Sequence, residues 1–121
     1  MEIKELATSY LETLLRLKEK RRFINYDLAN RLKVLEQNNN TVEGKLAILQ
    51  FKGEINANEE LYSQYEGELN EIKAELKPIL IELNANIFDP LRVQANGKTH
   101  FDTYIDENGD IQSPGYFTLL N

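Results

Sequence analysis

Residues 48–83 read ILQFKGEINANEELYSQYEGELNEIKAELKPILIEL, and the apolar pattern of this segment is the strongest indication of the fold. Its apolar residues recur at alternating spacings of three and four over about five heptads, which is typical of a coiled-coil helix. The positions are Ile48, Phe51, Ile55, Asn58, Tyr62, Tyr65, Leu69, Ile72, Leu76, Ile79 and Leu83, of which only Asn58 is polar. The pattern predicts one amphipathic helix with a kink at Pro78.

A second stripe of apolar residues, with the same helical spacing, precedes this segment. Its members are Ile3, Leu6, Tyr10, Leu14, Leu17, Arg21, Ile24, Leu28, Leu32 and Leu35, again spaced by three and four and interrupted once, by Arg21. The run Asn38-Asn39-Asn40 ends the stripe, because asparagine competes for the backbone hydrogen bonds of a helix. We therefore expect two helices, at about residues 2–37 and 41–86, joined by a short turn.

The two stripes match when the chain folds back between Asn39 and Asn40. Facing residues of an antiparallel hairpin then have numbers that add up to about 79, as Ile24 and Ile55 do. The two polar interruptions, Arg21 and Asn58, obey the same rule. We expect them to form a shared polar layer that fixes the register at some cost in stability, with Glu59 as a nearby charge partner.

Several apolar residues lie outside the two main stripes. They are Leu15, Phe23, Tyr26 and Val34 in the first helix and Val42, Leu46 and Leu49 in the second. A two-helix hairpin has little interior of its own, so these residues need another partner. We expect a homo-oligomer, a dimer or higher assembly, with Leu15, Phe23 and Tyr26 at the self-association contact. Packing of the chain's own tail on them is the alternative.

The last part of the chain carries turn signals instead of a helical period. Asp89-Pro90 marks a break, and the two Asn-Gly pairs, at residues 96–97 and 108–109, are typical of two-residue β-hairpin turns. They predict strands at residues 91–95, 98–106 and 110–112, and residues 116–120 form either a fourth strand or a docked tail. The expected fold is mainly α: an antiparallel coiled-coil helical hairpin (residues 1–87), then a small C-terminal β-meander (residues 88–121). Its candidate partner surface comprises Tyr104, Tyr116 and Phe117.

The stretch from Asp106 to Ile111 resembles the middle of an EF-hand calcium loop. Placing Gly109 at the sixth loop position puts Tyr104 at the first ligand position and Gly115 at the twelfth, where calcium needs carboxylates. We therefore predict a hairpin turn and no metal site. The chain has no cysteine, and its one histidine, His100, has no nucleophile in a recognisable arrangement. We expect neither a catalytic residue nor a cofactor.

The charge of the chain is unevenly distributed around a net value of −6. Residues 1–37 carry eight Lys/Arg against six Asp/Glu, whereas residues 38–87 carry four against nine. The acidic second helix would neutralise the basic cluster at residues 16–22, which argues against nucleic-acid binding. No apolar run is long enough to cross a bilayer, and no secretory signal is present, so we expect a cytoplasmic protein.

These patterns favour a non-enzymatic protein-protein interaction or assembly module. In this interpretation the coiled coil self-associates and the small β tail is presented to a protein partner. The alternative is a small phage or mobile-element regulator or inhibitor of a nucleic-acid enzyme, acting through the basic first helix or as an acidic mimic of phosphate.

Overall fold

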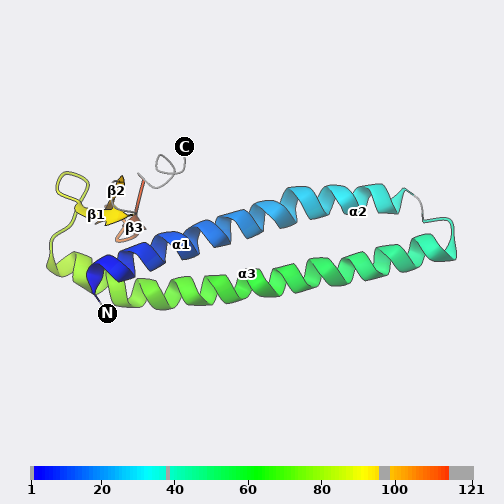
Figure 1. Cartoon of the computed structure of the whole chain (residues 1–121), viewed down its shortest axis with the longest axis horizontal. Coiled ribbons are helices and arrows are strands. Elements are labelled where there is room, and N and C mark those ends of the chain that lie inside the picture. The colour runs from blue at the N-terminus through cyan, green and yellow to red at the C-terminus, as the bar shows by residue number, and fades with distance from the viewer. Residues whose placement is uncertain (1, 38, 96–98, 115–121) are drawn as a thin grey trace. The chain divides into compact units, whose positions relative to one another are not determined.

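The computed structural model describes residues 2–37, 39–95 and 99–114. This part of the chain is mainly helical and ends in a small three-stranded antiparallel sheet (Figure 1). The helical elements are α1 (Ile3–Arg22), the π-helix η1 (Phe23–Leu28), α2 (Ala29–Glu36) and α3 (Val42–Glu82). The strands are β1 (Leu91–Ala95), β2 (Thr99–Ile105) and β3 (Ile111–Gln112). The predicted helical character and the predicted C-terminal sheet are both confirmed.

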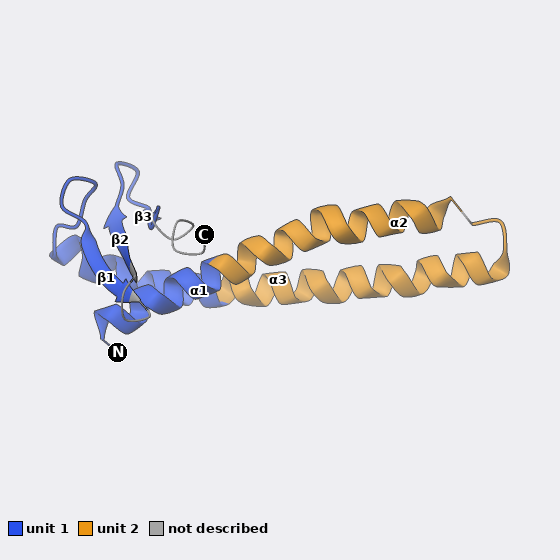
Figure 2. Ribbon diagram, turned by 45° about the horizontal axis from the view of Figure 1, so that its top comes forward, with its two compact units in different colours: residues 1–14, 68–121 blue, residues 15–67 orange. Residues whose placement is uncertain are grey.

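The elements divide into two compact units, residues 15–67 and residues 1–14 with 68–121 (Figure 2). Residues 15–67 are unit 2 in the figure. In this unit, η1 and α2 lie beside the N-terminal part of α3. Its core is a cluster of Ile24, Leu28 and Phe51, each at most 6% exposed. The surrounding residues are Phe23, Leu32, Leu35, Ile55 and Tyr62. This one cluster contains two of the facing pairs expected from numbers that add up to 79. The pairs are Leu28 with Phe51 and Ile24 with Ile55.

The six-residue π-helix η1 interrupts a helix that the sequence predicts as continuous α. A π-helix bonds each residue to the one five positions away, so that Phe23 and Leu28 come onto the same face. Phe23 accordingly packs against the core cluster of unit 2. The α-helical period had placed Phe23 outside the main stripe, because a hydrophobic pattern of threes and fours does not distinguish a single π turn.

The ends of α3 are set by local hydrogen bonds. The Thr41 hydroxyl oxygen accepts a hydrogen bond of 2.9 Å from the backbone N–H of Gly44, which caps the first turn. The helix continues through Pro78 and ends at Glu82, before the predicted end near residue 86. Asn84 has a φ of 54°, and the N–H of Ala85 bonds the carbonyl of Leu80 at 3.0 Å. This left-handed conformation stops the helix.

Unit 1, residues 1–14 and 68–121, contains the sheet. The strand order is β1-β2-β3, with Val93 opposite Phe101 and Ile105 opposite Ile111. The Tyr10 hydroxyl donates to the carbonyl of Ile111 at 3.3 Å, and burial raises the pKa of Tyr10, so the hydroxyl stays a donor. Other buried apolar residues of this unit are Leu6, Ala7, Leu11, Leu69, Leu76, Leu80 and Ala85.

Candidate interaction surfaces

The predicted polar layer falls inside unit 2. The guanidinium of Arg21 forms two hydrogen bonds with the Glu59 carboxylate, at 3.2 and 3.4 Å, and its Cζ lies 3.9 Å from the centre of the Tyr62 ring. These hydrogen bonds hold the pKa of Arg21 above its ordinary value. Because the Arg21 and Glu59 side chains are 36% and 45% exposed, water screens this ion pair.

Asn58, the other predicted member of the layer, bonds a different residue. Its amide oxygen accepts a hydrogen bond of 2.9 Å from Lys20 Nζ, and its amide nitrogen donates to the Glu54 carbonyl at 2.8 Å. The structure therefore places Arg21 and Asn58 at the same level of unit 2, each bonded to the opposite helical segment but through separate partners. Their role in fixing the register remains a prediction.

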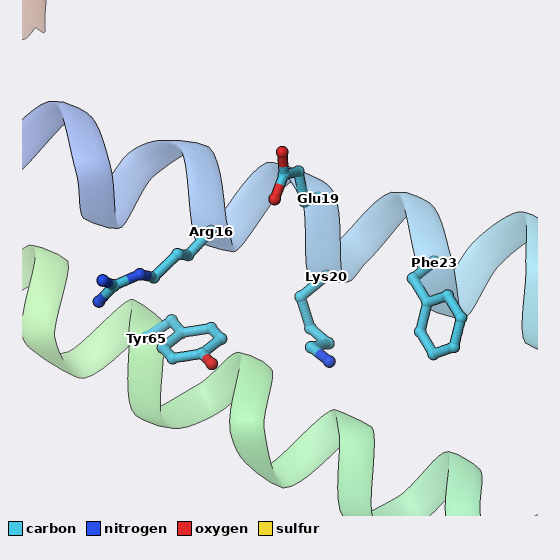
Figure 3. A pocket seen from close by; sticks show the side chains of 5 residues that line it. All are labelled: Arg16, Glu19, Lys20, Phe23 and Tyr65. Atoms are coloured by element: carbon cyan, nitrogen blue, oxygen red, sulfur yellow. The ribbon is translucent and has the colours of Figure 1, made fainter.

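A shallow recess of about 280 Å³ lies beside this layer. Its lining residues are Arg16, Glu19, Lys20, Phe23 and Tyr65, and Figure 3 shows Arg16 and Lys20 extending toward the helix that carries Tyr65. Lys20 Nζ is 5.4 Å from the centre of the Phe23 ring. Arg16 forms no ion pair with any residue that the structure describes. Two cations beside two aromatic rings suit contact with a carboxylate or another ring better than acid-base chemistry.

Most of the apolar residues outside the main stripes are exposed. Tyr26 is 65% exposed and Val34 is 59% exposed, while Leu15 and Phe23 are half-buried. On α3, the exposed fractions are 72% for Val42, 53% for Leu46 and 68% for Leu49. Unit 2 thus leaves apolar surface uncovered on both of its helical segments, and Tyr26 is the most accessible of the three residues predicted to mediate self-association.

Unit 1 exposes an apolar pair that the sequence interpretation missed. Ile87 is 64% exposed and Phe88 is 95% exposed. They occupy the tip of a tight turn in which Asn86 and Asp89 exchange backbone hydrogen bonds of 3.2 and 3.1 Å. The Asn86 side-chain oxygen also accepts from the N–H groups of Phe88 and Asp89, at 2.9 and 3.1 Å. This turn holds two large apolar side chains in water, where polar residues are the usual choice.

A pocket of about 430 Å³ adjoins this turn within unit 1. Its lining residues are Asn86, Ile87, Phe88, Tyr104, Ile105, Asp106, Glu107 and Asn108. Tyr104, a predicted partner residue, is half-buried and lines the pocket, whereas Tyr116 and Phe117 lie outside the described residues. The available signal for the missed pair was an apolar dipeptide between the turn formers Asn86 and Asp89-Pro90.

The loop that resembles a calcium site is a hairpin turn between β2 and β3. One Asp106 carboxylate oxygen accepts hydrogen bonds from the N–H groups of Asn108 and Asp110, both at 2.9 Å. The other oxygen accepts from the Gln112 side chain at 2.8 Å. Gly109 adopts a φ of 81°, as the Asn-Gly pair predicts. These bonds lower the pKa of Asp106 and direct its carboxylate into the turn.

Comparison with known proteins gives no family for the chain: no protein-family model, curated protein or solved structure matches it. Among the described residues, none of the helices has both the length and the apolar character that spanning a membrane requires. The exposed apolar side chains of the two units are therefore the main guide to function.

Proposed function

We propose that this chain is a non-enzymatic interaction module that self-associates through an antiparallel coiled-coil hairpin and presents a surface of unit 1 to a protein partner. The hairpin proposal is supported by the contacts of unit 2. The Arg21–Glu59 pair and the Lys20–Asn58 bond join residues whose numbers add up to 80 and 78. In the core cluster, Leu28 and Phe51 have numbers that add up to 79.

The observation that carries the proposal is the exposure of large apolar side chains on hydrogen-bonded backbone. Phe88 is 95% exposed on a turn whose backbone groups are hydrogen-bonded, so its backbone is held in place although no described residue covers its ring. Aromatic residues are enriched among the side chains that dominate binding at protein interfaces. We therefore assign the Phe88 surface, defined as Ile87, Phe88 and Tyr104, to a protein partner.

A hydrophobic fluorescent dye tests whether the Phe88 surface is available for binding. We expect the dye to bind the native protein and expect Phe88→Ser to lose most of this signal while retaining the wild-type circular dichroism. Val34→Ser, which removes an exposed side chain from unit 2, is the matched control for a general loss of apolar surface. Equal dye binding by wild type and Phe88→Ser would argue against this surface.

A further inference from the structure

The exposed apolar residues of α3 form a stripe with coiled-coil spacing. Val42, Leu46 and Leu49 are separated by four and three residues, and at about 100° per residue their side chains project within a narrow arc. Phe51, which is 6% exposed in the core of unit 2, projects from the opposite side of the helix. The stripe is thus a second apolar seam, turned away from the one that packs within the chain.

Gly53 continues this seam at the next position, four residues after Leu49. A Cβ atom placed on Gly53 would meet nothing within 4 Å, so contacts within the described chain give no reason for the missing side chain. Glycine destabilises the interior of a helix relative to alanine. A neighbouring helix that approaches closely along the seam would account for both the glycine and the uncovered leucines.

Opposite charges line the two edges of the seam. Lys45 and Lys52 project along one edge, and Glu43 and Glu54 project along the other, with Gln50 between the two glutamates. All four charged side chains are exposed, and none forms an ion pair with another residue that the structure describes. Any helix that covers the seam will therefore meet lysines on one side and glutamates on the other.

We infer that the seam is covered by α3 of a second copy of this chain, with the two α3 helices parallel and related by a two-fold axis. In a parallel pair the lysine edge of each helix faces the glutamate edge of its partner. In an antiparallel pair like edges meet, and lysine would face lysine. A second copy carries the same two edges, and only the parallel direction brings unlike edges together. The inference rests on the proposed self-association and specifies its contact surface.

A parallel two-fold pair stacks each seam residue on its own counterpart. Val42 then faces Val42 of the second copy, Leu46 faces Leu46 and Leu49 faces Leu49, in successive layers. In an antiparallel pair the counterpart changes with position: Leu46 would face Leu49, and Val42 would face Gly53. Cross-linking of identical positions therefore separates the two arrangements.

Single cysteines test this directly, because the chain contains none of its own. We expect Val42→Cys, Leu46→Cys and Leu49→Cys each to give a disulfide-linked dimer under mild oxidation, and expect the exposed control Asn25→Cys to give little. Linkage at residues 46 and 49 but not 42 would overturn the parallel direction. If no seam position links while the wild type is an oligomer, the seam assignment fails although self-association stands. A monomeric wild type would refute both.

Charge reversal gives an independent readout. Lys45→Glu with Lys52→Glu should weaken the dimer about tenfold, since several exposed ion pairs of modest strength are replaced by repulsion. Adding Glu43→Lys and Glu54→Lys to the same chain should restore the dimer. Dimerisation that is unaffected by the first pair of changes would contradict the inference. Circular dichroism of each variant checks that the helices are intact.

Discussion

Arg21 lies over the ring of Tyr62, with its Cζ 3.9 Å from the ring centre, while its guanidinium bonds Glu59. This arrangement places a cation among the partly buried side chains that join the two helical segments of unit 2. An aliphatic residue at this position would pack against the same ring without desolvating a charge. The arrangement therefore suggests that the polar residues here limit stability.

The double variant Arg21→Leu with Asn58→Leu should be more stable than the wild type. Replacing partly buried polar groups by apolar ones is often neutral or stabilising, and we expect a gain of about 1 kcal/mol in the free energy of unfolding. Chemical denaturation measures this gain, with Arg16→Leu as the control at an exposed, unpaired arginine. If the polar layer fixes the register, the double variant will also show additional amide resonances. A loss of helicity would contradict the prediction.

The core of unit 2 should be sensitive to truncation at Leu28. This side chain is 2% exposed, so Leu28→Ala should lower the free energy of unfolding by about 2–5 kcal/mol through lost burial and a cavity. Val34→Ala removes apolar atoms from an exposed site and should change stability by less than about 0.5 kcal/mol. Urea denaturation of both variants checks the difference, and equal effects would show that Leu28 is not in a packed core.

The stability of unit 1 should fall in acid through Asp106. Its folded pKa is lowered below the ordinary value of 3.8, because backbone N–H groups and Gln112 bond the charged carboxylate. A lowered folded pKa stabilises the native state above the unfolded pKa, and this stabilisation is lost as the pH falls through the folded pKa. The melting temperature should therefore fall below about pH 4, where an ordinary aspartate becomes protonated.

Asp106→Asn isolates this contribution, since the amide oxygen can still accept the backbone hydrogen bonds of the turn but does not titrate. We expect this variant to melt below the wild type at neutral pH and to show a shallower decline in acid. Glu107→Gln, at an exposed neighbour, is the control and should retain the wild-type profile. Identical acid profiles for wild type and Asp106→Asn would contradict the assignment.

Direct binding to nucleic acid should be absent or weak. Arg16 and Lys20 line an open recess, but Glu19 lines it too, Glu59 of α3 pairs with the neighbouring Arg21, and the net charge of the chain is −6. Electrophoretic mobility shifts with duplex and single-stranded DNA at low and physiological salt measure this. Salt-sensitive binding that is abolished by Arg16→Ala would instead favour the alternative role as a regulator of a nucleic-acid enzyme.

The sequence was informative where periodicity and turn chemistry determine structure. The spacing of Ile24, Leu28 and Phe51 predicted which residues share the core, and the Asn108-Gly109 pair predicted the β2–β3 turn. The π-helix could not be predicted, because its apolar residues also fit an α-helical period. The flanking Asn86 and Asp89-Pro90 do indicate a turn around Phe88, but its exposure could not be predicted, since it depends on the hydrogen bonds of Asn86 and on the position of the turn beside the sheet.

The mass of the protein in solution, measured by sedimentation equilibrium over a range of concentrations, shows whether the chain self-associates. We expect the wild type to exceed the 14.0 kDa of one chain and to dissociate on dilution, and expect Leu46→Glu to stay monomeric with unchanged helicity. A wild-type mass of 14.0 kDa at every concentration would contradict self-association.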